Sequence, residues 1–167
     1  MIVPDSGWRI PLDSLTDSNG KVYGQGGNLE ALVDTGYTNR IGVPASIMKR
    51  IKTKIPRNCM KFPNGFPDFF FTFKGQRFSL KPHDYVANNK KCSSDPQHTT
   101  ARIVFHDHGF SDNMIVLGVP YLKTVYTVFH IDKKSIGFAN EMQLTDDDET
   151  NHEEDVYTDV IFHDELL

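Results

Sequence analysis

The sequence lacks any apolar run long enough to cross a membrane, and its first residues lack the pattern of a signal peptide. A membrane-spanning helix needs about 20 consecutive, mainly apolar residues, whereas the apolar residues here (38 %) are spread along the chain. The segment 1–5 has neither a basic stretch nor an apolar core, so we expect no signal peptide in this sequence. We therefore expect no membrane among the partners of this protein.

Cysteine is scarce, with Cys59 and Cys92 as the only two among 167 residues. Two cysteines can form one disulfide or remain two thiols, and composition leaves both open. Clusters of Lys and Arg interleaved with aromatic residues, which are typical of nucleic-acid binding, are also absent. We expect no nucleic acid among the partners.

Basic residues are absent from the last part of the chain. Residues 141–167 contain 11 acidic residues and no Lys or Arg, whereas residues 1–140 contain 18 basic and 11 acidic residues, a charge of +7. Apolar periodicity is also lost after residue 140, which predicts a disordered acidic tail over 141–167. The alternative is that this tail docks on the basic body, in which case the contacts should weaken as salt rises.

Residues 1–140 have the pattern of one mostly β-sheet domain. The 12 glycines and 9 prolines are spread between short alternating runs, as in chains with many turns. Phe69, Phe71 and Phe73 share one face of a predicted hairpin strand, which indicates core packing. Apolar residues at helical spacing predict one helix over 45–54, and a second short helical turn is expected near residue 120.

Asp34 is the first candidate for a catalytic residue. The largely apolar run 29–33 predicts a buried strand, and the sequence Asp34-Thr35-Gly36 predicts a turn directly after it. A carboxylate at the end of a rigid strand is well placed for chemistry because the strand fixes its position.

A cluster of imidazoles and carboxylates occurs further along, at His106, Asp107, His108 and Asp112. Both groups can bind zinc. The spacing matches no known framework, so we interpret the segment as a polar loop and expect no metal.

Four stretches together resemble the C-terminal lobe of the pepsin-like aspartic proteases (peptidase family A1). They are residues 8–14, residues 31–36, the hairpin 66–75, and the closing segments 116–118, 126–131 and 136–139. The resemblance implies a single all-β acid-protease lobe over residues 1–140, built mostly of antiparallel sheets with one or two short helices. It also implies a disulfide between Cys59 and Cys92, which lie where that lobe usually has one.

Enzymes of this family use two aspartates, one from each lobe, to activate a water molecule against a peptide bond. The resemblance implies that Asp34 is the catalytic residue of this lobe and that Thr35 hydrogen-bonds to the loop of the other lobe. Gly36 would let the backbone turn, and Gly118 would pack under the active-site loop. The family usually has Thr and Ser after this turn, and Tyr37 and Thr38 stand there instead.

Because the chain contains a single Asp-Thr-Gly, activity would require an N-terminal protease lobe or a second subunit. The substrate would be a polypeptide, without a cofactor, and the compartment would be secreted, lysosomal or vacuolar. One alternative is a non-catalytic peptide-binding homologue that keeps the cleft wall. Another is a homodimer of identical lobes.

Overall fold

The fold is described from a computed structural model of the chain. It describes residues 7–55, 63, 65–91, 99–109, 111–140 and 161–163, and for 88–91, 99–101 and 161–163 only the backbone is described. Cys59 and Cys92 lie outside the described residues, as does most of the segment 141–167. The predicted disulfide therefore stays a prediction, as does the predicted disorder of residues 141–160 and 164–167.

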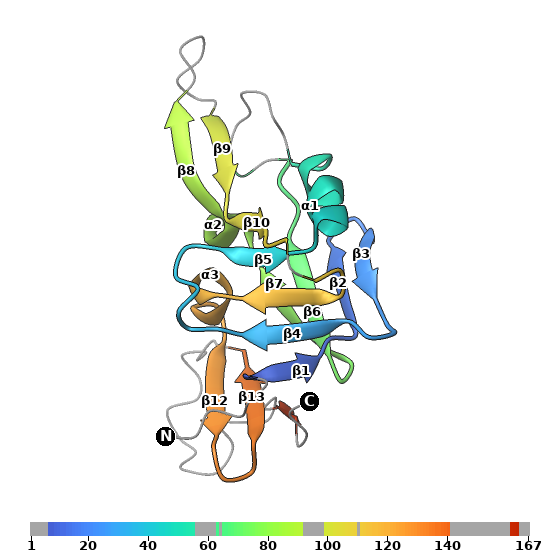
Figure 1. Cartoon of the computed structure of the whole chain (residues 1–167). Helices are drawn as coiled ribbons and strands as arrows, with labels where there is room; N and C mark the ends of the chain where they lie inside the picture. Colours follow the sequence, from blue (N-terminus) through green and yellow to red (C-terminus); the bar gives the residue numbers. More distant parts are fainter. Residues whose placement is uncertain are drawn as a thin grey trace, which may run out of the picture.

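The described strands form four sheets (Figure 1). The five-stranded sheet has the order β1 (Arg9–Pro11), β4 (Glu30–Val33), β11 (Met114–Leu117), β5 (Ile41–Val43) and β10 (Phe105–Asp107). The four-stranded sheet has the order β3 (Val22–Gln25), β2 (Ser14–Asp17), β6 (Phe69–Phe73) and β7 (Gln76–Leu80). The other two sheets consist of β12 (Tyr126–His130), β13 (Ser135–Ala139) and β14 (Ile161–His163), and of β8 (Val86–Lys91) and β9 (Thr99–Ile103).

Three short helices accompany the sheets: α1 (Ala45–Lys52), α2 (Pro82–Tyr85) and α3 (Val119–Leu122). Most strand pairs are antiparallel, and the parallel ones are β4 with β11 and β5 with β10. The predicted all-β class is confirmed, with three described helices rather than one or two. No described helix is both long and apolar enough to cross a bilayer.

The hairpin of β6 and β7 supplies the centre of the core. Phe69, Phe71 and Phe73 are completely buried, as their alternation predicts. The ring centroid of Phe71 lies 4.9 Å from that of Tyr121 on α3, and that of Phe73 lies 5.2 Å from that of Phe138 on β13. Aromatic side chains of one strand thus join three parts of the chain that are distant in sequence.

Helix α1 packs its apolar residues Ile47, Met48 and Ile51 inward, as the sequence spacing predicts. Its Arg50 donates hydrogen bonds to two carbonyl oxygens of β3, those of Val22 and Tyr23. The helix therefore fixes the edge of the four-stranded sheet through Arg50, while its other basic residues, Lys49 and Lys52, are exposed.

The three-stranded sheet contains an unexpected element. Strand β14 pairs with β13 in antiparallel register, with Ile161 opposite Phe138 and His163 opposite Ile136. The predicted disorder of the tail is therefore wrong at residues 161–163. The sequence pattern does not predict this strand, because three residues are too few to show an alternation.

Candidate active site

The loop that carries Asp34 crosses the end of a central strand. Strand β11 lies between β4 and β5 and runs parallel to β4, with Leu117 opposite Val33. The chain leaves β4, passes through the loop 34–40 and returns as β5 on the other side of β11 (Figure 1). Asp34 and Gly118 therefore follow directly from two neighbouring parallel strands.

Backbone and side-chain hydrogen bonds fix Asp34 at the start of this loop. Its N–H donates to the carbonyl oxygen of Leu117 (3.1 Å), and its own carbonyl oxygen accepts from the N–H of Tyr37 (3.1 Å). The carboxylate oxygen Oδ1 accepts from the N–H of Gly36 (2.8 Å), a turn geometry that Asp favours. The side chain stays only partly buried, so the carboxylate is both positioned and accessible.

Gly118 packs directly against the same loop. A Cβ atom at this position would clash with the backbone carbonyl oxygens of Tyr37 and Arg40. The N–H of Val119 donates to the carbonyl oxygen of Tyr37 (3.0 Å). The φ of Gly118 is −88°, an ordinary value for any residue, so close packing rather than backbone conformation requires glycine here.

The remaining residues of the motif are placed differently around the carboxylate. Thr35 and Thr38 are exposed, and Tyr37 is partly buried. Among the described residues, the N–H of Gly36 is the one hydrogen-bond donor to the Asp34 carboxylate, and no hydroxyl of Tyr37 or Thr38 contacts it. The carboxylate thus lacks a side-chain donor within the part of the chain that the structure describes.

The imidazole and carboxylate groups near β10 do not converge on one point. Nε2 of His108 lies 2.7 Å from the carbonyl oxygen of Met114, and Oδ1 of Asp107 accepts from the N–H of Gly109 (3.0 Å). The described residues contain no group of three His, Cys, Asp or Glu side chains that could hold a metal ion. His106 and Asp107 lie in strand β10 rather than in the predicted polar loop, and the side chains of Asp107 and His108 contact local backbone groups.

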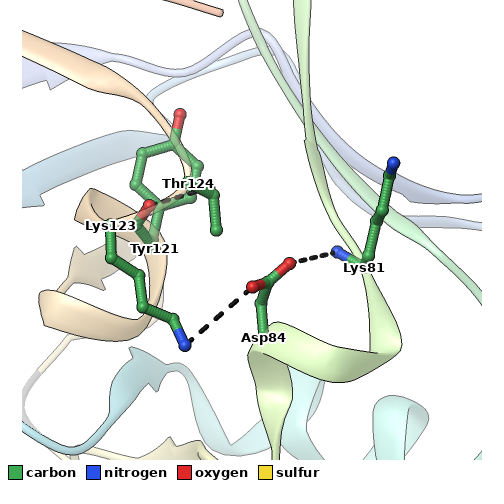
Figure 2. A network of polar contacts seen from close by, with 5 residues as sticks. All are labelled: Lys81, Asp84, Tyr121, Lys123 and Thr124. Atoms are coloured by element: carbon green, nitrogen blue, oxygen red, sulfur yellow. Dashed lines mark hydrogen bonds and ion pairs between the residues drawn. The ribbon is translucent and has the colours of Figure 1, made fainter. Parts of the chain in front are cut away.

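A pocket of about 1140 Å³ lies beside the Asp34 loop. Its walls come from the loop residues Thr38 to Arg40, from the three helices, and from β8, β9 and β10. Asp84 on α2 is held within it: Oδ1 lies 3.9 Å from Nζ of Lys123, and Oδ2 accepts from the N–H of Lys81 (3.2 Å) (Figure 2). Sequence reasoning missed this pocket because its residues come from segments that are distant in sequence. The net charge of +7 on residues 1–140 was the only signal of its basic character.

Comparison with known proteins gives consistent matches over most of the chain. A family model described as eukaryotic aspartyl protease matches residues 1–141. The vacuolar aspartic protease of Candida albicans is 26% identical over 146 residues, which cover 79% of this chain and 32% of that protein. Plasmepsin IV of Plasmodium falciparum is 30% identical over 143 residues, covering 79% of this chain and 29% of that protein.

Pepsin A of Rhinolophus ferrumequinum is 27% identical over 143 residues, which cover 79% of this chain and 35% of that protein. The chain thus spans about a third of the length of the curated relatives it matches.

Proposed function

The chain belongs to the eukaryotic aspartyl protease family, and from this premise we propose that it is one lobe of an aspartic-type endopeptidase with Asp34 as a catalytic carboxylate. The observation that carries the proposal is the placement of Asp34 at the end of β4, in which Ala31 and Val33 are buried. Its backbone is tied to β11 through Leu117, and its carboxylate is oriented by Gly36 while remaining accessible. A carboxylate held in this way is prepared for acid–base chemistry.

Catalysis of this kind needs a second carboxylate close to Asp34. Two carboxyl groups held close together do not both ionise readily, so one keeps its proton while the other acts as a base. The base takes a proton from a water molecule, the water oxygen attacks the peptide carbonyl carbon, and the protonated carboxyl gives its proton to the carbonyl oxygen. Collapse of the tetrahedral intermediate then breaks the C–N bond as the amide nitrogen gains a proton.

The second carboxylate would come from another lobe or from a second subunit, because this chain contains a single Asp-Thr-Gly. In this arrangement exposed Thr35 would contact the partner loop, and Gly36 would keep the backbone close to the partner carboxylate. Gly118 would keep the loop 34–40 in place, which agrees with its contacts to the carbonyl oxygens of Tyr37 and Arg40.

A non-catalytic peptide-binding homologue is the second candidate. It is favoured by the absence of any Tyr37 or Thr38 hydroxyl at the Asp34 carboxylate among the described residues. A carboxylate with fewer donors is less well oriented for proton transfer. Such a protein would still bind an extended polypeptide along the wall of the cleft.

The substrate class and the compartment follow from the family. We propose a polypeptide substrate, and the vacuolar proteases among the relatives support a secreted or vacuolar compartment. Such compartments favour a disulfide between Cys59 and Cys92. Alkylation of the unfolded native protein without reductant should then modify neither cysteine.

Cleavage of an unfolded protein at acidic pH tests the proposal. The assay should use the native full-length protein or this chain produced together with a complementary lobe. Asp34→Asn should abolish cleavage because it retains the shape of the side chain but removes the acid. Asp132→Asn, at an exposed position in the β12–β13 turn, is the matched control and should cleave at the wild-type rate.

The same variants separate the two candidates. Peptide binding without cleavage in both the wild type and Asp34→Asn would establish the binding homologue. Cleavage that persists in Asp34→Asn would exclude Asp34 as a catalytic residue.

A further inference from the structure

The pocket beside the Asp34 loop is lined by more cations than carboxylates. Four Lys or Arg residues contribute to its wall, and two aspartates oppose them. The cations are Arg40, Lys52, Arg102 and Lys123, and the carboxylates are Asp84 and Asp107. All four cations line the pocket and are exposed, so their charges are accessible to solvent.

The two aspartates do not neutralise this pocket. The Asp84 carboxylate already pairs with the amine of Lys123 and accepts a hydrogen bond from the N–H of Lys81 (Figure 2). The Asp107 carboxylate accepts a hydrogen bond from the N–H of Gly109. Within the described residues, Arg40, Lys52 and Arg102 have no ionic partner. Three cations around one concave surface raise the local concentration of anionic groups.

The strand that precedes the segment with the complementary charge ends near one edge of this surface. Residues 141–160 contain nine acidic and no basic residues. The segment follows β13, whose last residue Ala139 pairs with Tyr126. Tyr126 is three residues from Lys123, so the two Cα atoms are at most about 11 Å apart.

The strand that follows the segment lies beside the strand that precedes it. Ile161 of β14 pairs with Phe138, next to Ala139. A chain of 20 residues that leaves and returns at one point can reach roughly 33 Å from it. Both its length and its ends therefore allow the segment to lie along the pocket.

We propose that this pocket is the docking surface for the acidic segment 141–160 of the same chain. The carboxylates of the segment pair with Arg40, Lys52 and Arg102. The surface borders the loop 34–40 and does not include Asp34. Docking can therefore be measured separately from peptidase activity.

Zero-length carbodiimide crosslinking of the full chain, read by mass spectrometry, tests the proposal. Lys52 is the reporter, because an amide forms only where a carboxylate of 141–160 contacts its amine. We expect Lys52 to crosslink to this segment at about 0.1 M salt. The yield should fall at least about threefold at about 1 M salt, where the Debye length shrinks from about 10 Å to about 3 Å.

A matched pair of variants localises the effect. Arg40→Gln with Arg102→Gln removes two pocket cations and should reduce the Lys52 crosslinks at least about threefold. The control variant, Lys49→Gln with Lys54→Gln, removes the same charge from exposed positions near Lys52 that do not line the pocket. This control should leave the yield of Lys52 crosslinks unchanged. An equal loss of Lys52 crosslinks in both variants would overturn the proposal. Equal crosslinking of the segment to Lys49, Lys52 and Lys54 in the wild type would overturn it as well.

Isotope mixing and an active-site variant complete the test. In an equal mixture of unlabelled and ¹⁵N-labelled protein, docking within one chain gives Lys52 crosslinks of a single isotope composition. Mixed crosslinks would show that a second copy supplies the segment, which overturns the proposal. Asp34→Asn should crosslink like the wild type, so that loss of activity and loss of docking are distinguished.

Discussion

At the scale of single residues, Gly118 decides how closely the loop 34–40 can approach β11. Its neighbours are backbone carbonyl oxygens of Tyr37 and Arg40 rather than flexible side chains, so a methyl group cannot be accommodated by rotation. The loop itself would have to move, and Asp34 would be disturbed with it because its carbonyl oxygen accepts a hydrogen bond from the N–H of Tyr37.

Gly118→Ala is therefore expected to lower the free energy of unfolding by about 3 kcal/mol, the upper end of the usual cost of overpacking. Gly20→Ala is the control: its Cβ would meet no atom within 4 Å, and its only cost is that of a φ of 76°, about 1 kcal/mol. Denaturant unfolding of both variants measures the difference. Equal losses would contradict the packing argument.

Part of the residue-scale picture follows from the sequence. The sequence predicts Asp34 in a turn after a buried strand. The structure has the turn, with the carboxylate accepting from the N–H of Gly36, but β4 alternates buried and half-buried residues. The contact of Gly118 with two specific carbonyl oxygens could not be predicted, because it depends on the path of a loop. The catalytic roles of Asp34, Thr35 and Gly36 stay predictions.

At the scale of elements, β6 shows that alternation along one strand assigns neighbouring phenylalanines to different environments. Phe71 is completely buried against Tyr121. Phe70 lies on the other face, where the guanidinium carbon of Arg77 is 4.0 Å from the ring centroid. The two side chains share residue type and strand, and they differ in what surrounds them.

Phe71→Ala is expected to lower the free energy of unfolding by about 4 kcal/mol, because it leaves a cavity in the core. Phe70→Ala should cost less, about 1 to 2 kcal/mol, since the half-buried ring loses some apolar contact and its cation–π contact with exposed Arg77. Denaturant unfolding measures both losses of free energy, from the midpoints of the two variants and a common dependence of the free energy on denaturant concentration. A larger effect at Phe70 would mean that the assignment of faces is wrong.

The length of a helix or strand decides whether it can be predicted from the sequence. The β6–β7 hairpin and α1 were predicted because five to eight residues are enough to show a period of 2 or 3.6. Helix α2 and strand β14, with four and three residues, are too short to show one. Their formation depends on tertiary contacts, such as the pairing of β14 with β13.

At the scale of the whole molecule, three buried tyrosines make the free energy of unfolding depend on pH in the alkaline range. Burial raises the pKa of Tyr23, and its hydrogen bond to Asp17 (2.8 Å) adds to the shift. Burial also raises the pKa of Tyr85 and Tyr121 above the ordinary value of 10.0. All three phenols therefore stay protonated in the folded protein at a pH where those of the unfolded chain ionise.

The sign of the effect follows from proton binding. As the pH rises above 10, the unfolded chain loses these protons first, so the stabilisation present below pH 10 is progressively lost. We expect the free energy of unfolding to fall by up to about 4 kcal/mol per pH unit for three tyrosines. Denaturant unfolding curves measured at a series of pH values above 10 test this. Tyr23→Phe should reduce the slope of the free energy of unfolding against pH by about a third. A flat profile would contradict the burial of these groups.

The size of the native protein is the remaining prediction at this scale. The chain contains one Asp-Thr-Gly and spans about a third of its relatives, whereas the proposed chemistry needs two carboxylates. Intact mass spectrometry of the protein from its source, under denaturing and reducing conditions, should therefore show a species of roughly twice 19.0 kDa or more. The second carboxylate would then lie in the same polypeptide.

A denatured mass of 19.0 kDa would instead require the second carboxylate to come from another chain. Native mass spectrometry should then show a complex, and Asp34→Asn should abolish cleavage without dissociating it. A lone species of 19.0 kDa under both conditions would leave Asp34 without a partner. The peptide-binding homologue would then be the function that the fold supports.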